Sequence, residues 1–137
     1  MNDIADEMLY VARQRFKHTD HIYFTEDPVE NLSFSTSSFD SVVSINAFHN
    51  YVSKEKAISE IFRVLKPGGR FYILDWNRSG MFLPVNFIID IFTGEHIDTW
   101  SGKEVEKILI EKDFKGIRDF KEWYYKYWKF FLLVAKK

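Results

Sequence analysis

The stretch that decides the fold is residues 39–76, FDSVVSINAFHNYVSKEKAISEIFRVLKPGGRFYILDW. Residues 39–46 are rich in β-branched and small side chains, which is typical of a buried strand. A helix is predicted over residues 54–65, where apolar side chains recur at helical spacing. Pro67-Gly68-Gly69 then makes a tight turn, and residues 70–76 form a second strand. A strand, a helix and a strand in this order predict a right-handed unit with parallel strands, and so an α/β fold.

The other elements are predicted from similar patterns: a helix over 6–16, a strand over 21–24, a helix over 84–92, a helix over 102–112, and strands over 117–125 and 128–135. The last two strands are so close in sequence that they must form an antiparallel hairpin. Ser53 and Ser101 are N-cap candidates, and Glu104 completes a capping box with Ser101. No linker divides the chain, so residues 1–137 are predicted to form a single domain.

Composition narrows the function classes. The chain has 137 residues, a net charge of −1 and no cysteine, which argues against a strongly basic nucleic-acid binder and excludes thiolate chemistry. No apolar run is long enough to span a bilayer, and the acidic N-terminus is unlike a signal peptide. The four histidines show no metal-ligand spacing. We therefore expect a cytoplasmic protein with no metal site, no membrane partner and no nucleic-acid partner.

One basic and aromatic run stands out near the C-terminus. Residues 121–129 read KEWYYKYWK, and such a mixture could stack nucleic-acid bases. Because it falls at the tip of the predicted hairpin, we interpret it as structural.

Three segments are similar to class I S-adenosylmethionine-dependent methyltransferases. Residues 3–13 (DIADEMLYVAR) resemble the family's segment from the second strand into its helix, and residues 38–49 (SFDSVVSINAFH) resemble its fourth-strand motif. Residues 60–70 (EIFRVLKPGGR) resemble its helix, turn and fifth strand, and this run is the most specific of the three. The segments occur in the family's order and spacing.

The resemblance implies a truncated Rossmann-like fold: a mostly parallel sheet with a C-terminal antiparallel hairpin, in the family's strand order 3-2-1-4-5-7-6. In the family, the preceding chain contributes the first strand and a glycine-rich turn that receives the cofactor. None of the six glycines here forms a Gly-x-Gly run after a strand. We therefore expect an N-terminally truncated domain.

Loss of the first strand would leave the fourth strand, residues 40–46, at an exposed edge, which is an aggregation liability. Three outcomes are open. The strand over 21–24 moves in to pair with it, two copies form a dimer through it, or a second chain supplies the glycine-rich half. A fourth is that the chain is a fragment without a function of its own.

The resemblance also places cofactor residues. Asp3 stands where the family's acid accepts the two ribose hydroxyls; the alternative is a solvated N-terminal acid. Around the adenine, Pro28 occupies the usual acid position, Asp27 lies one residue earlier, and Val29 could offer its N–H. A simple turn that breaks a strand explains this segment equally well.

The segment after the fourth strand holds the remaining candidates. Asn46 and Ala47 are expected at the cofactor, where ligands bind beyond the carboxyl ends of strands. His49 is the candidate catalytic residue, as a general base or an acceptor-orienting group; the alternative is a loop histidine without chemistry. Asp75 and Trp76 end the next strand and line a pocket or cap the following segment. The family builds its acceptor lid where this chain has Phe82, Phe87, Phe92 and Trp100.

Two functions follow from these observations. The resemblance implies an enzyme, the C-terminal portion of a methyltransferase that moves a methyl group from S-adenosylmethionine to an unidentified acceptor. The absent glycine-rich motif favours the alternative, a non-catalytic methyltransferase-like interaction or regulatory subunit that needs a partner. Fold resemblance cannot decide between them, because function depends on the site.

Overall fold

A computed structural model describes residues 1–78, 98–125 and 128–137 of the chain. Its elements, in chain order, are α1 (Asp6–Arg15), β1 (Phe39–Ile45), the short 3-10 helix η1 (Phe48–Asn50), α2 (Lys54–Val64), β2 (Leu65–Trp76), α4 (Gly102–Glu111), β3 (Lys115–Tyr125) and β4 (Trp128–Lys136). The predicted helix over 84–92 lies outside the described residues, as do Phe82, Phe87 and Phe92. In the part of the chain that the structure describes, no helix is long and apolar enough to cross a membrane.

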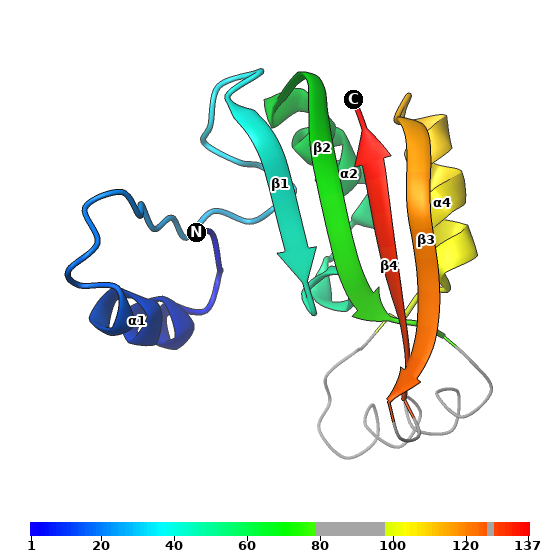
Figure 1. Cartoon of the computed structure of the whole chain (residues 1–137). Helices are drawn as coiled ribbons and strands as arrows, with labels where there is room; N and C mark the ends of the chain where they lie inside the picture. The colour runs from blue at the N-terminus through cyan, green and yellow to red at the C-terminus, as the bar shows by residue number, and fades with distance from the viewer. Residues whose placement is uncertain (79–97, 126–127) are drawn as a thin grey trace.

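The four strands form one sheet in the order β1-β2-β4-β3 (Figure 1). β1 and β2 are parallel, whereas β4 runs antiparallel to both β2 and β3. This confirms the strand–helix–strand unit and the hairpin. In the family's numbering, β1, β2, β4 and β3 are strands 4, 5, 7 and 6, so this part of the strand order that the resemblance implies is confirmed as well. The expectation of a mostly parallel sheet is wrong for the described strands, because inserting β4 between β2 and β3 makes two of the three pairings antiparallel.

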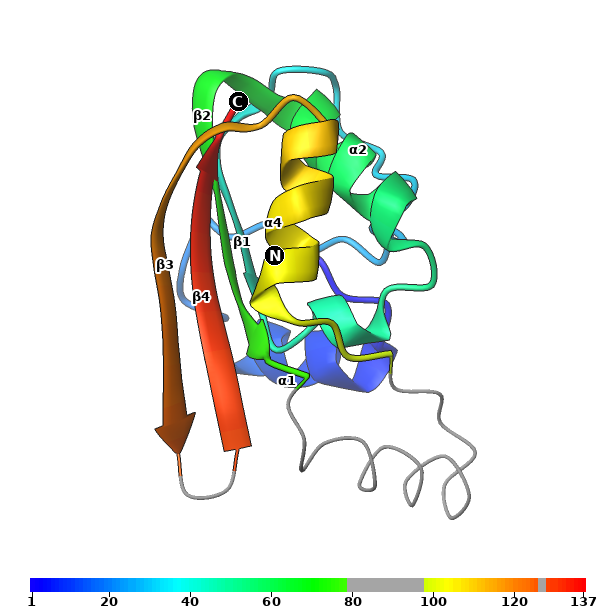
Figure 2. The ribbon, with the colours of Figure 1, turned by 90° about the vertical axis from the view of Figure 1, so that its right-hand side faces the viewer.

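Helices α2 and α4 both lie on one face of the sheet (Figure 2). The core lies between these two helices and the sheet, because alternate strand residues point to this face. Its fully buried members include Phe71 and Ile73 of β2, Phe131 and Leu133 of β4, Ile58 and Ile61 of α2, and Val105 and Leu109 of α4. The opposite face carries no described helix, and on it Val43 and Ile45 of β1 are 60% and 59% exposed.

Helix starts and stops follow the sequence closely. The Ser53 side chain accepts from the Lys56 N–H at the start of α2. At the start of α4, Ser101 and Glu104 form the complete capping box. These bonds satisfy N–H groups that have no partner within a helix.

β2 begins earlier than predicted, at Leu65 rather than Arg70, so the expected tight turn is wrong. The ladder pairs Phe39 with Leu65 and then Ser41 with Arg70, so the glycines form a bulge inside the strand. Gly68 has a φ of +81°, and a Cβ on Gly69 would lie 2.9 Å from the Lys66 carbonyl oxygen. Glycine is needed at both positions, and the bulge allows the chain to pass from α2 directly into the sheet.

The predicted strand over residues 21–24 does not form. One parallel bridge joins Asn2 to Thr25, with the Asp3 N–H donating to the Thr25 carbonyl at 3.2 Å. The segment lies with α1 to the side of β1 and does not pair with it (Figure 1). Of the three outcomes left open, the one in which this strand moves in beside β1 is therefore wrong, and β1 has only β2 as a neighbour among the described strands. A single bridge cannot propagate a ladder, because the partner strand is too short.

Lys137 ties the end of β4 to the end of α2. Its Nζ donates to the Phe62 and Leu65 carbonyl oxygens, both at 2.7 Å. We predict that Lys137→Met lowers the free energy of unfolding by about 2 kcal/mol, because charge-assisted bonds to helix-terminal carbonyls are lost. Urea denaturation measures this, with the exposed neighbour Lys136→Met as the control, expected within ~0.5 kcal/mol of the parent. Equal losses in both variants would contradict the capping role.

Candidate functional site

The carboxyl ends of β1 and β2 lie side by side and bring the sequence-predicted residues after β1 to one edge of the sheet. The Asn46 N–H donates to the Leu74 carbonyl at 2.9 Å, which extends the parallel ladder by one bond. Asn46 then adopts a left-handed φ of +49°, a conformation that asparagine tolerates better than most residues. This turn directs the chain through Ala47 into η1, which contains His49.

His49 and Asp75 form a buried pair at this edge. The His49 Nδ1 and an Asp75 Oδ1 are 2.8 Å apart, and the two side chains are 10% and 1% exposed. The Asp75 carboxylate also accepts the Phe48 N–H at 2.8 Å and the Trp76 N–H at 2.7 Å. A carboxylate at Nδ1 fixes the orientation of the imidazole and leaves Nε2 as the atom available for proton transfer. This geometry supports the catalytic prediction for His49 without testing it.

Aromatic rings stack beside this pair. The His49 ring lies parallel to the Trp76 indole, with centroids 5.1 Å apart and an interplanar angle of 8°. On β4, the Trp128 ring stacks at 5.8 Å from Trp76. The wall beside His49 is therefore flat and largely apolar.

Tyr51, which directly follows η1, contacts β1 through its side chain. Its hydroxyl lies 2.9 Å from the Ser44 Oγ. Burial raises the pKa of Tyr51, and the negative charges of Asp75, Glu30 and Asp3 raise it further, against the lowering effect of the Ser44 bond. Tyr51 therefore stays neutral.

A buried lysine fixes the chain that enters α4. The Lys54 side chain is only 3% exposed, and its Nζ lies 2.9 Å from Asp98 Oδ2. The Trp100 Nε1 donates to the same oxygen at 2.8 Å. The Arg78 N–H donates to the Trp100 carbonyl at 3.2 Å. These contacts connect the end of β2, the start of α4 and the first residue of α2 beside the site.

The N-terminal cofactor candidates form a second group. Asp3 is half-buried, and its Oδ1 accepts the Ala5 N–H at 3.0 Å. The Asn2 side chain donates to the Asp27 carbonyl oxygen at 3.0 Å, which brings Asp3 and Asp27 near each other. The Asp27 carboxylate accepts both the N–H and the hydroxyl of Ser33, at 3.2 and 2.6 Å. Asp27 is thus already engaged in its loop, whereas Asp3 keeps acceptor capacity.

Pro28 and Val29 differ in their surroundings. Pro28 is exposed and its carbonyl accepts the Asn31 N–H at 2.9 Å, which closes a turn. Val29 packs against the hydrophobic core. The turn that we weighed as an alternative is therefore present, and it anchors the loop to the body of the domain through Val29.

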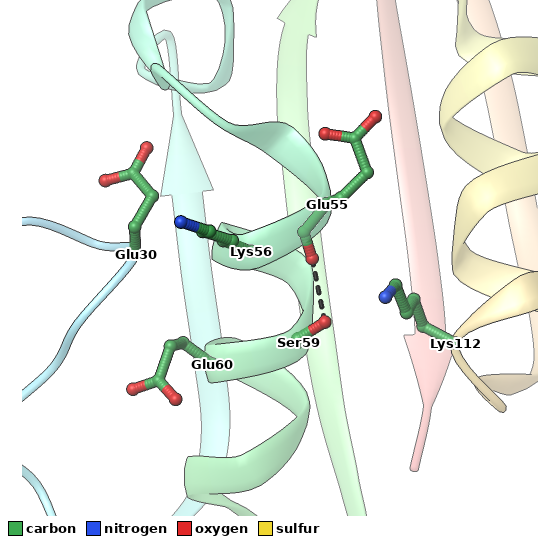
Figure 3. A pocket seen from close by; sticks show the side chains of 6 residues that line it. All are labelled: Glu30, Glu55, Lys56, Ser59, Glu60 and Lys112. Atoms are coloured by element: carbon green, nitrogen blue, oxygen red, sulfur yellow. Dashed lines mark hydrogen bonds between the residues drawn. The ribbon is translucent and has the colours of Figure 1, made fainter.

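A hollow of about 200 Å³ lies away from this edge, over the outer side of α2 (Figure 3). It is lined by Glu30, Glu55, Lys56, Ser59, Glu60 and Lys112. Two of its carboxylates are already committed, since Glu30 accepts the Ser53 N–H and Glu60 pairs with Arg63 at 2.7 Å. The Arg63 bond lowers the pKa of Glu60. The side chains that line this hollow do not suggest a catalytic or binding site.

Sequence reasoning did not pair Asp75 with His49, and it did not single out Lys54. A signal for the first was present, because Asp75 ends a strand parallel and adjacent to the one that precedes His49. No signal in the sequence marks Lys54 as buried, because it begins a helix where lysines are usually solvated.

Comparison with known proteins decides the family. A family model described as "Methyltransferase domain" matches residues 1–73, more than half of the chain. The chain belongs to the class I S-adenosylmethionine-dependent methyltransferases. Members of this family use S-adenosylmethionine, and the match covers α1, β1, the His49 turn and α2.

Curated relatives of this methyltransferase chain are about a third identical to it over the matched residues. A ubiquinone/menaquinone biosynthesis C-methyltransferase UbiE of Wigglesworthia glossinidia brevipalpis is 34% identical over 94 residues, covering 66% of the chain and 37% of the relative. A demethylmenaquinone methyltransferase of Clavibacter sepedonicus is 36% identical over 75 residues, covering 55% of the chain and 31% of the relative. The chain thus spans about a third of the length of these relatives.

Solved structures support the same fold at low identity. The YcgJ protein of Bacillus subtilis superposes with a TM-score of 0.84 at 20% identity, covering 99% of the chain and 80% of that protein. A SAM-dependent methyltransferase of Methanosarcina mazei gives a TM-score of 0.80 at 20% identity, over 99% of the chain and 80% of that protein. At these identities the similarity establishes the fold alone.

Proposed function

We propose that this chain carries the acceptor side of a methyl-transfer site, with His49 as the general base and Asp75 as its positioning residue. The observation that carries the proposal is the buried His49–Asp75 contact of 2.8 Å at the carboxyl ends of β1 and β2. Ligands of open α/β sheets bind at such an edge. A structural histidine does not require a buried carboxylate at Nδ1 and a parallel indole on its face.

The residues present fit part of the cofactor. Asp3 is a half-buried carboxylate with remaining acceptor capacity, which suits a pair of ribose hydroxyls. Asn46 and Ala47 lie at the turn after β1, close to His49 in sequence and space. Asp27 suits the adenine amine less well, because Ser33 occupies one of its oxygens. We propose that Asp3, Asn46 and Ala47 bind the cofactor and that the loop of Asp27, Pro28 and Val29 borders the adenine.

The chemistry follows from these positions. When bound, S-adenosylmethionine would supply a sulfonium methyl group to the acceptor atom, and the electron pair of the carbon–sulfur bond would stay with sulfur. His49 Nε2 takes the acceptor's proton, and Asp75 stabilises the imidazolium that results. The flat wall of Trp76 and Trp128 would orient the acceptor for in-line attack.

The relatives' names suggest an acceptor class. They are C-methyltransferases of quinone biosynthesis, so we propose a hydroxylated aromatic ring as acceptor. Removal of the hydroxyl proton by His49 would raise the nucleophilicity of the neighbouring ring carbon. After that carbon bonds the methyl group, it would lose its own proton to solvent, and the His49 imidazolium would return the first proton to the oxygen, which restores the aromatic ring. The flat apolar wall beside His49 supports a planar acceptor.

The unpaired edge of β1 bears on assembly. Val43 and Ile45 are exposed on this strand, and β2 is its only described neighbour. We propose that β1 is covered in the active assembly, either by a second copy as a homodimer or by a segment of another chain that supplies a glycine-rich turn.

Calorimetric titration with S-adenosylhomocysteine tests the proposal. We expect binding in the micromolar to millimolar range, weakened about tenfold by Asp3→Asn and by Asn46→Gly, which keeps the left-handed turn but removes the side chain. Asp20→Asn, an exposed acid elsewhere, is the control. Absence of binding by the chain in its native oligomeric state would favour the alternative, a non-catalytic methyltransferase-like subunit.

A further inference from the structure

The face of the sheet opposite α2 and α4 is apolar, and it carries no described helix (Figure 1 and Figure 2). Along β2 and β4, the residues that alternate with the buried core point to this face. The ladders place their apolar side chains beside two from β1. These six residues form the open face: Val43, Ile45, Tyr72, Leu74, Leu132 and Val134.

The open face is unusual for a surface in water. An antiparallel sheet with one wet face normally alternates apolar residues inside with polar residues outside. Here the outward positions are mostly apolar as well, with Val43 and Ile45 exposed and the four members on β2 and β4 half-buried. A contiguous apolar band of this kind marks an interaction surface.

A row of three cations crosses the sheet at one end of this band. Arg70 of β2 pairs in the ladder with Lys136 of β4, which pairs with Lys115 of β3. All three are exposed, and their side chains form no hydrogen bond or ion pair with the described residues. Like charges directly opposite one another on a sheet are destabilising. An anionic group across Arg70, Lys115 and Lys136, the basic row, would therefore stabilise this end of the sheet.

An α-helix fits both features. From Arg70 to Trp76, β2 rises by about 20 Å, which matches a helix of about 13 residues. A helix packs on a sheet through an apolar stripe along one side. We propose that the open face binds an amphipathic helix of another polypeptide, with acidic side chains at the end that covers the basic row. This proposal does not rest on the proposed methyl transfer.

A second copy of this chain fits the surface less well. Among the described side chains that β1, β2 and β4 present on this face, none is a carboxylate. Two open faces packed together would bury two basic rows, and neither copy would supply a counter-charge. The partner must therefore bring its own acidic groups.

Lipid and nucleic acid also fit less well than a helix. A bilayer would take up the band together with the free N–H and C=O groups on the edge of β1, which find no hydrogen-bond partner in hydrocarbon. Single-stranded nucleic acid stacks its bases on aromatic rings, whereas five of the six members of the open face are aliphatic. A helix satisfies its own backbone and needs no rings.

Selection from a displayed library of helical peptides tests the proposal with the full chain. The library fixes a leucine stripe at helical spacing and varies the other positions among glutamate, lysine, glutamine and serine. We expect glutamate to be enriched at one end of the helix. Against the charge-reversed variant, Arg70→Glu with Lys136→Glu, the same library should enrich lysine at these positions instead.

Titration of an enriched peptide then measures each contribution. The charge-reversed variant should bind it about tenfold more weakly, and Val43→Ser with Ile45→Ser should also weaken binding about tenfold. The controls are Lys107→Glu, on α4 with a side chain 80% exposed, and Val11→Ser, on α1 and 59% exposed. Each should change the affinity by about twofold or less. Circular dichroism confirms that every variant is folded.

Several results would overturn the proposal. The first three are enrichment of no peptide, enrichment without a charge preference, and equal losses in the face and control variants. A parent dimer that Leu132→Ser dissociates in sedimentation equilibrium would assign the face to a second copy. Tighter face-dependent binding to phosphatidylglycerol vesicles or single-stranded DNA than to the peptide would assign it to those partners.

Binding of S-adenosylhomocysteine is measured in the charge-reversed variant as well. It should stay unchanged, because the basic row and His49 lie at opposite ends of β2. Failure of helix binding and failure of the methyl-transfer proposal are therefore distinguishable.

Discussion

Replacement of Asp75 by alanine is expected to lower the free energy of unfolding by about 3–5 kcal/mol. The carboxylate is 1% exposed and accepts three hydrogen bonds, from the Phe48 N–H, His49 Nδ1 and the Trp76 N–H. Alanine would leave the Phe48 N–H and His49 Nδ1 buried without this acceptor, and would also remove the part-buried bond from the Trp76 N–H. Such a loss is a large fraction of the stability of a small domain.

Urea denaturation of Asp75→Ala and Asp75→Asn measures this effect. Asparagine keeps one acceptor oxygen, so we expect it to lose less stability than alanine does. The exposed Asp40→Ala, with a side chain that is 85% exposed, is the control and should change stability by less than ~1 kcal/mol. If Asp75→Ala were no less stable than this control, the buried network would not be a stabilising feature.

His49→Gln is expected to reduce the rate of methyl transfer by about 10²–10⁴-fold while binding of S-adenosylhomocysteine stays unchanged. Glutamine retains a polar side chain beside Asp75 but cannot take up a proton. Single-turnover assays with hydroxylated aromatic acceptors and radiolabelled S-adenosylmethionine measure the rate.

His18→Gln is the matched control, because His18 is exposed and lies away from the sheet edge. A full rate in His49→Gln would show that methyl transfer here depends on alignment of acceptor and methyl group alone. Loss of both the rate and cofactor binding would assign His49 to the structure of the site rather than to the proton transfer.

Local sequence patterns predicted the strongest elements of this fold. β1, α2 and the hairpin carry clear periodicity, and the capping box of Ser101 and Glu104 occurs as predicted. The predicted start of β2 was wrong. Pro67-Gly68-Gly69 is usually a turn, and it forms a bulge here because Leu65 pairs with Phe39. The strand over 21–24 failed for the opposite reason, since a suitable local pattern found no partner long enough to form a ladder.

The sequence predicted only part of the candidate site. His49 follows a strand that ends at a ligand-binding edge, which general rules of α/β sheets locate. Its pairing with Asp75 depends on the register between β1 and β2, and residues 26 apart in sequence give no local sign of that contact. The same holds for Lys54, whose burial depends on Asp98 and Trp100.

The position of β4 between β2 and β3 has a consequence for synthesis on the ribosome. β2 and β3 emerge first but have no direct pairing, so neither can complete its ladder until residues 128–136 have left the exit tunnel. Until then the apolar sides of β1, β2 and β3 are open to other nascent chains. Production of this protein should therefore depend on chaperones that hold the nascent chain during the interval before β4 inserts.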